Sequence, residues 1–112
     1  MKTIGIIGGM GPLATADLYQ KLIRFTGAQC DQAHPHVIID SNTAIPDRSA
    51  AILRHGEDPA PEMIRSARRL QDAGAEVLLI ACNTAHYWFD EIQSSVEIPI
   101  LHMPRLTAAA VR

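Results

Sequence analysis

Short apolar runs recur along the chain at intervals that suit alternating strands and helices. The first run, residues 3–7, is rich in β-branched residues and ends in Gly8-Gly9, and the later runs cover residues 37–39, 77–80 and 98–101. The run at 77–80 is apolar on consecutive positions, which is typical of a strand covered on both faces. We therefore expect four buried strands.

Between the apolar runs, hydrophobic residues repeat every three or four positions, which predicts helices. The first helix covers about residues 13–29, and the third begins at about Thr84. The second helix lies between Pro59 and Gly74, residue types that suit a helix start and a helix end. Its inner stripe consists of Met63, Ile64, Ala67 and Leu70. A last helical pattern covers residues 106–111.

The order of these elements is βαβαβαβα, which predicts an α/β fold with a four-stranded parallel sheet, helices on both faces and right-handed crossovers. A chain of 112 residues suits one domain, which we take as residues 1–112. The mostly polar stretch from Ser41 to Pro59 contains two prolines and a glycine between apolar segments. We expect a long loop there.

Composition and charge exclude several partners. The hydrophobic fraction is 47%, the charged fraction 20% and the formal charge −2, as in ordinary soluble domains. Arg65, Arg68 and Arg69 form the only basic cluster, which reads as the solvated face of a helix and argues against nucleic-acid binding. No stretch is long enough for a signal peptide or a membrane span, so we expect a cytoplasmic protein that does not engage membranes.

Chemically useful residues follow the predicted strands. In open α/β sheets, ligands bind beyond the carboxyl ends of the strands. Those ends carry the segments Gly8-Gly9-Met10-Gly11-Pro12, Ser41-Asn42-Thr43, Ala81-Cys82-Asn83-Thr84 and His102-Met103-Pro104. Small residues, hydrogen-bonding side chains and one thiol therefore converge on one edge of the predicted sheet.

The glycine segment after the first strand allows two interpretations. It lacks the spacing of dinucleotide-binding loops and the lysine of a P-loop. A glycine turn that leads into a helix N-terminus attracts anions, carboxylate as readily as phosphate. The alternative is a tight turn in which glycine is required only by a positive φ.

Cys82 occupies the junction between a buried strand and a new helix. The positive potential of a helix start would favour the reactive thiolate there, and Asn83 and Thr84 suit the N-cap. A small buried cysteine with routine capping is the alternative. For Cys30, near the predicted end of the first helix, we adopt that alternative. Neither cysteine lies in a Cys-x-x-Cys pair, so we expect no metal site.

Three further side chains are ambiguous by themselves. The guanidinium of Arg48 matches a carboxylate with two hydrogen bonds, although an exposed surface arginine is the alternative. His86 lies in the first turn of a predicted helix, where a neutral, hydrogen-bonded structural role competes with catalysis. His102 follows the fourth strand and suits the lining of a cleft.

Taken together, three blocks resemble the aspartate/glutamate racemase family. They are the segment from Ile4 to Pro12, Asn42 with Ile45-Pro46-Asp47-Arg48, and Ala81-Cys82-Asn83-Thr84-Ala85-His86. The blocks occur in the family's order along essentially the whole chain. The Cys-Asn-Thr-Ala-His block together with Pro-Asp-Arg is the specific part.

The resemblance implies an amino-acid racemase, an isomerase that works without pyridoxal phosphate or metal. Such enzymes have two pseudo-symmetric α/β halves, each with one cysteine facing the substrate α-carbon, and one thiolate removes the α-proton while the other thiol returns one. Carried over to this chain, Cys82 is the first-half thiol. The implied substrate-binding residues are Met10 and Gly11 through their backbone, Asn42 at the rim, Arg48 on a carboxylate, and Asn83 with Thr84 on the α-carboxylate.

The chain departs from the family pattern because it contains one such half, the N-terminal one. The second catalytic cysteine belongs to the other half, and Cys30 lies in the wrong block to replace it. We expect negligible racemase activity from residues 1–112 alone, with a missing C-terminal half or a second subunit as partner. The family suggests a homodimer and an amino-acid or dicarboxylate ligand.

Alternatives remain open at this stage. A related paired-cysteine isomerase acting on maleate, hydantoins or arylmalonates is one, although the Gly-Met-Gly-Pro and Pro-Asp-Arg blocks favour amino-acid racemases. A non-catalytic dicarboxylate-binding domain or a truncated remnant is the other. The sequence does not separate aspartate from glutamate as the substrate.

Overall fold

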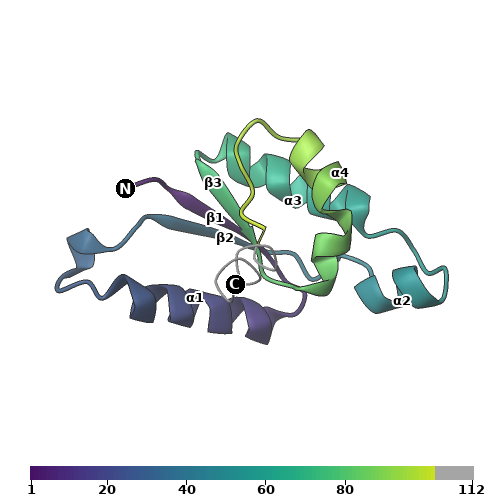
Figure 1. Ribbon diagram of the computed structural model, residues 1–112, viewed down its shortest axis with the longest axis horizontal. Helices are drawn as coiled ribbons and strands as arrows, with labels where there is room; N and C mark the ends of the chain where they lie inside the picture. The colour runs from purple at the N-terminus through teal and green to yellow at the C-terminus, as the bar shows by residue number, and fades with distance from the viewer. Residues whose placement is uncertain (103–112) are drawn as a thin grey trace, which may run out of the picture.

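A parallel sheet of three strands organises the part of the chain that the structure describes. The computed structural model describes residues 1–102, and its sheet order is β2-β1-β3 (Figure 1). β1 covers Ile4–Gly8, β2 covers Val37–Ser41 and β3 covers Val77–Ile80. In the central strand, Ile6 is in register with Ile39 on one side and Leu79 on the other. The predicted α/β class and parallel sheet are confirmed.

Helices cover both faces of the sheet, as predicted. α1 (Pro12–Thr26) lies on one face, while α3 (Ala60–Asp72) and α4 (Phe89–Ser94) lie on the other (Figure 1). Successive strand residues alternate between the two layers: Ile7 packs in the core with α3 and α4, and Ile6 packs with residues of α1. The inner stripe of α3 is buried at Met63, Ala67 and Leu70, and Ile64 is half-buried.

The predicted fourth strand is reduced to a single bridge. Ile100 pairs with Leu78 in parallel orientation, and no longer strand forms at residues 98–101. Pro99 has no N–H to offer a ladder, and side-chain amides bind the backbone of its neighbours. Gln93 Oε1 accepts from the Ile100 N–H at 2.8 Å, and its Nε2 donates to the Ile98 carbonyl at 3.0 Å. The expectation of four strands was therefore wrong by one.

Helix boundaries also differ from the expected ones. α1 ends at Thr26 because Gly27 takes a left-handed conformation, with φ of 62°. The stretch expected to be a loop contains α2 (Arg48–Leu53). The Asp47 side chain caps the start of this helix by accepting a hydrogen bond from the Ala50 N–H at 3.0 Å. An Asp at this position is a recognised helix start, so the signal was present in the sequence.

Two shorter helical segments complete the described chain. The 3-10 helix η1 spans Asp31–Ala33, and the predicted third helix is divided into the 3-10 helix η2 (Thr84–Trp88) and α4. The helix expected at residues 106–111 lies outside the described residues. Over residues 1–102, no helix combines the length and apolarity that a bilayer crossing requires.

Candidate active site

The turn between β1 and α1 is closed by the side chain of Thr15. The Gly9 N–H donates to Thr15 Oγ1 at 2.9 Å, and this hydroxyl donates to the Gly11 carbonyl at 3.1 Å. Thr15 is the one fully buried residue of α1. The hydroxyl therefore holds the turn against the first turn of the helix. Sequence reasoning missed Thr15, because a threonine in a predicted helix carries no sign of such a bond.

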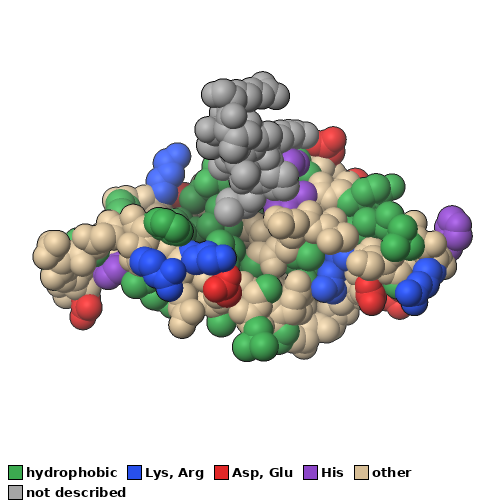
Figure 2. Space-filling model, turned by 60° about the horizontal axis from the view of Figure 1, so that its bottom comes forward, with side chains coloured by type: hydrophobic (Ala, Val, Ile, Leu, Met, Phe, Trp, Pro, Cys, Tyr) green, Lys and Arg blue, Asp and Glu red, His purple; other side chains and the backbone are tan. Residues whose placement is uncertain are grey.

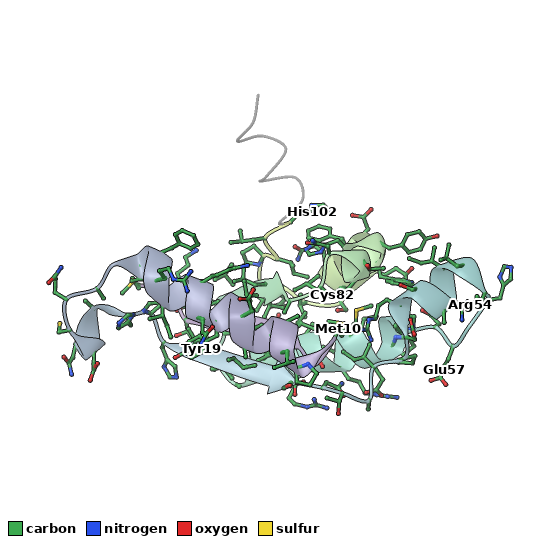
Figure 3. The ribbon with its side chains drawn as sticks, turned by 90° about the horizontal axis from the view of Figure 1, so that it is seen from below. Met10, Tyr19, Arg54, Glu57, Cys82 and His102 are labelled. Atoms are coloured by element: carbon green, nitrogen blue, oxygen red, sulfur yellow. The ribbon has the colours of Figure 1, made fainter. Side chains whose placement is uncertain are left out.

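Cys82 lies just beyond the last backbone bond that joins β3 to β1. That bond runs from the Ala81 N–H to the Ile7 carbonyl at 3.0 Å. Cys82 is half-buried and packs against the core cluster that contains Met10; Figure 3 labels both residues. The cysteine thus stands at the carboxyl edge of the sheet, next to the glycine turn.

A hollow of about 230 Å³ opens between Cys82 and the start of α1. Its walls come from the first turns of α1 and from the end of β3, and its lining residues are Ala14, Asp17, Leu18, Ile80, Ala81, Cys82 and Asn83. The first turns of α1 and the thiol segment therefore meet at this hollow, and the glycine turn is not part of its lining. Asp17, whose carboxylate is paired with Lys21 at 2.8 Å, brings a negative charge to this hollow.

The segment after Cys82 differs from the helix start that the sequence suggested. Asn83 occupies the N-cap position of η2, but its side chain makes no capping hydrogen bond. The predicted capping is therefore wrong, and both Asn83 and Thr84 are exposed. Because η2 is a five-residue 3-10 helix, fewer aligned peptide dipoles point at Cys82 than a long α-helix would supply.

Arg48 is the first residue of α2 and is half-buried. Its Nη1 donates to the Pro46 carbonyl at 3.2 Å, while Nε is buried without a hydrogen-bond partner. Within residues 1–102, no carboxylate lies within ion-pair distance of this guanidinium. α2 packs against η2, which brings the arginine helix next to the segment that follows Cys82.

The Asn42 side chain is committed to α3. Its Nδ2 donates to Glu62 Oε2 at 3.2 Å and to Ser66 Oγ at 3.1 Å, and its Oδ1 accepts from the Ala44 N–H at 3.1 Å. The Asn42 hydrogen bond holds the pKa of Glu62 below its ordinary value of 4.5, and Arg65 adds to this effect. In this arrangement Asn42 joins the end of β2 to α3.

His86 and His102 both pack against Phe89, the first residue of α4. His86 is 8% exposed, and its Nδ1 lies 2.8 Å from the Cys82 carbonyl oxygen. The two imidazole centroids are 5.1 Å apart. Burial lowers the pKa of His86, although the hydrogen bond to Cys82 opposes the shift. His86 is thus hydrogen-bonded inside the protein, in line with the first of its two interpretations.

The second cysteine is remote from this edge of the sheet. Cys30 precedes η1 and therefore stands before the start of β2, at the amino ends of the strands. It is exposed, which corrects the expectation of a buried cysteine. Both thiols are free. In the described part of the chain, no three or more His, Cys, Asp or Glu side chains are grouped to hold a metal ion.

These features define an α/β domain that presents a cysteine beside a glycine turn at the carboxyl edge of a parallel sheet. Residues 7–112 match the family model of Asp/Glu/hydantoin racemases. The chain belongs to the Asp/Glu/hydantoin racemase family.

Relatives of known name support this membership. The broad-specificity amino-acid racemase RacX of Bacillus subtilis (strain 168) is 34% identical over 104 residues, which cover 89% of this chain and 45% of RacX. The aspartate racemase of Picrophilus torridus is 37% identical with a TM-score of 0.91, over 99% of this chain and 47% of that one. An aspartate racemase homologue from Pyrococcus horikoshii OT3 is 35% identical with a TM-score of 0.72, over 90% and 44%. The chain spans about half the length of these relatives.

Proposed function

We propose that residues 1–112 form the N-terminal half of an aspartate/glutamate-type amino-acid racemase in which Cys82 is one of two thiol acid/bases. The observation that carries the proposal is the position of Cys82, beyond β3 and on the hollow that it shares with the start of α1. Family membership supports the reaction class. The named relatives are racemases of amino acids, or of aspartate in particular.

The proposed chemistry is a proton exchange at the substrate α-carbon. The Cys82 thiolate takes the α-proton and becomes a thiol, and the C–H electron pair stays on the α-carbon, delocalised into the carboxyl group. A thiol on the opposite face then gives a proton to that carbon, which inverts it, and is left as a thiolate. Only protons move between carbon and sulfur, so the proposed reaction uses no cofactor.

Anchoring of the substrate is assigned to Asn83, which lines the hollow, and to residues of the neighbouring segments. The free amide of Asn83 and the hydroxyl of Thr84 are proposed to hold the α-carboxylate, next to the backbone of Met10 and Gly11. Arg48 is proposed to bind a carboxylate by exchanging its bond to the Pro46 carbonyl for a bidentate pair. The role at the pocket rim is retained for the Asn42 backbone, since its side chain is bound to α3.

The opposing thiol is assigned to a second α/β half. Cys30 stands at the opposite end of the strands from Cys82 and does not face the same hollow. The relatives are about twice the length of this chain, which supports a second half as the source. A homodimer and a cytoplasmic location are further parts of the proposal.

A chimera tests the proposal directly. Residues 1–112 are joined to the C-terminal half of the P. torridus aspartate racemase, 47% of which matches this chain at a TM-score of 0.91. Racemisation and α-proton exchange in D₂O are measured with aspartate and glutamate. We expect turnover by the chimera, a loss of about 10²–10⁴-fold on Cys82→Ser, and full activity in the matched control Cys30→Ser.

Two outcomes would overturn the proposal. An active chimera that keeps its rate after Cys82→Ser would remove the acid/base role of Cys82. Robust turnover by residues 1–112 alone would show that no second half is needed. A folded but inactive chimera, together with aspartate binding by residues 1–112, would instead favour a dicarboxylate-binding domain.

A further inference from the structure

His86 bonds back to the segment that carries the proposed catalytic thiol. Its ring Nδ1 lies 2.8 Å from the Cys82 carbonyl oxygen, and its backbone N–H donates to the Asn83 carbonyl at 3.1 Å. A carbonyl oxygen only accepts hydrogen bonds, so Nδ1 must carry the proton. The structure therefore assigns one tautomer to His86, with hydrogen on Nδ1.

The other ring nitrogen has no comparable partner. Nε2 of His86 is buried without a hydrogen bond among the described residues. The ring stacks on Phe89 at a centroid distance of 6.5 Å, and the edge of His102 approaches it. Protonation at Nε2 would place an unpaired charged N–H in this packed site, which is costly. His86 is thus held as a neutral imidazole.

The sheet does not hold the backbone at Cys82. The last bond from β3 to β1 is donated by the Ala81 N–H, and the carbonyl of the following residue, Cys82, is the one that His86 binds. The imidazole therefore fixes the peptide group that links Cys82 to Asn83. The orientation of this peptide group is set by the ψ angle of Cys82. Because backbone dihedral angles also determine where a side chain points, the direction of the Cys82 side chain is fixed with it.

We propose that His86 is a positioning residue: its Nδ1–H clamps the Cys82 carbonyl and so sets the direction in which the thiol meets the hollow beside α1. This inference rests on the proposed function only in treating Cys82 as a catalytic thiol. The clamp itself acts on the Cys82 backbone and does not depend on that role. His86 exchanges no proton with Cys82, because its Nδ1 proton is used by the carbonyl. A histidine that activated the thiol would have to direct a free nitrogen to Sγ.

Two amide variants of the same polarity test the clamp. In His86→Asn the side-chain N–H₂ stands near the place of Nδ1 and keeps a donor to the carbonyl. In His86→Gln it stands near the place of Nε2, one bond too far. Residues 1–112 are treated with N-ethylmaleimide, and the rate at Cys82 is divided by the rate at Cys30 in the same molecule, which is exposed and remote.

The expected result is a wild-type rate ratio in His86→Asn and a ratio about fivefold higher in His86→Gln, because one hydrogen bond no longer keeps the junction closed. Equal ratios in both variants would overturn the clamp, whether both are high or both unchanged. Circular dichroism confirms that the variants are folded; if His86→Gln is not, His86→Asn must still give the wild-type ratio.

Two readings separate the clamp from other roles of a buried histidine. The ¹⁵N spectrum of labelled His86 should show the neutral form with hydrogen on Nδ1 at pH 7, and hydrogen on Nε2 would refute it. Alkylation of Cys82 should rise with pH in a single step in both the wild type and His86→Asn. An additional acidic step that disappears in His86→Asn would identify His86 as a base instead. Neither reading requires racemase activity, so an inactive chimera would leave this inference standing.

Discussion

Gly9 and Asn42 approach each other so closely that the glycine has no room for a side chain. A Cβ atom on Gly9 would lie 2.3 Å from the carbonyl carbon of Asn42, and the φ angle of Gly9 is 93°. The contact brings the turn after β1 against the end of β2, and the Asn42 N–H donates to the Gly8 carbonyl at 3.0 Å. Two of the three segments that carry the family resemblance are thereby joined backbone to backbone.

We expect Gly9→Ala to lower the free energy of unfolding by at least about 2 kcal/mol, from positive φ and steric overlap together. Gly74→Ala is the matched control, because Gly74 has a φ of 106° but nothing within 4 Å of its Cβ position. Urea unfolding followed by circular dichroism gives both values. Equal losses in the two variants would show that the contact with Asn42 contributes nothing.

Acid sensitivity is expected from the bond between Asn42 and Glu62. Asn42 holds the pKa of Glu62 below 4.5 in the folded state. The unfolded chain then takes up a proton at a higher pH than the folded one, so this contribution to stability is present above pH 4.5 and is lost as the pH falls through the folded pKa. Asn42→Ala and Glu62→Gln should each weaken the fall of the urea midpoint below pH 4.5. An unchanged acid profile in both variants would contradict the assignment.

Because of the buried His86, we expect folding stability to depend on pH in a second, separate range. Burial lowers its pKa below 6.5 in the folded protein. As the pH falls below 6.5, the unfolded chain gains a proton that the folded chain resists, so stability decreases towards the folded pKa. Between pH 8 and 5, the urea midpoint should fall more steeply in the wild type than in His86→Asn. The remaining histidines are common to both proteins, and parallel curves would argue against a neutral, buried His86.

Alkylation rates of the two cysteines show whether reactivity or accessibility dominates at Cys82. Cys30 is exposed and Cys82 half-buried, so accessibility alone would favour Cys30. We nevertheless expect iodoacetamide to modify Cys82 first at neutral pH, because the proposed acid/base role requires a reactive thiol that opens on the hollow. Peptide mass spectrometry over time distinguishes the two sites. Faster modification of Cys30 would remove the main physical support for Cys82 as an acid/base.

An apolar groove beside α1 should make copies of the chain associate. The groove has a volume of about 320 Å³, and its apolar lining includes Leu18, Leu22, Phe25, Val77, Leu79 and Leu101. Phe25 is 82% exposed, and hydrophobic side chains are visible among charged ones on this side of the molecule (Figure 2). Exposed patches of this kind favour association.

Phe25→Asp should raise the concentration at which light scattering detects association by about tenfold or more, because the burial of one phenylalanine contributes at least about 1.5 kcal/mol. Leu53→Asp is the control, since Leu53 is 75% exposed but lies on α2, outside the groove. A wild-type chain that stays monomeric at high concentration would contradict the prediction, and so would an equal effect of both variants.

Predictability from sequence varied with the range of the interactions. The strands β1, β2 and β3 and the helix α3 follow from local hydrophobic patterns, because a buried strand or an amphipathic helix carries its own periodicity. The division of the third helix into η2 and α4 was not predicted, and neither was the loss of the fourth strand. The backbone N–H groups of Glu97 and Ile98 are bound by the Gln71 side chain of the distant helix α3, so no local pattern could reveal the loss of this strand.

The same distinction applies to the site. Sequence alone determined that a cysteine, a glycine turn and two capping-type residues would follow strands of a parallel sheet, because such a sheet aligns its carboxyl ends. Tertiary structure decided which side chains remain available: Asn42 is bound to α3, Asn83 is free of its cap, and His86 holds the Cys82 carbonyl. A hydrogen bond between distant segments forms only when its donor–acceptor distance is right to within a few tenths of an ångström. Only the packing of the helices on the sheet sets that distance.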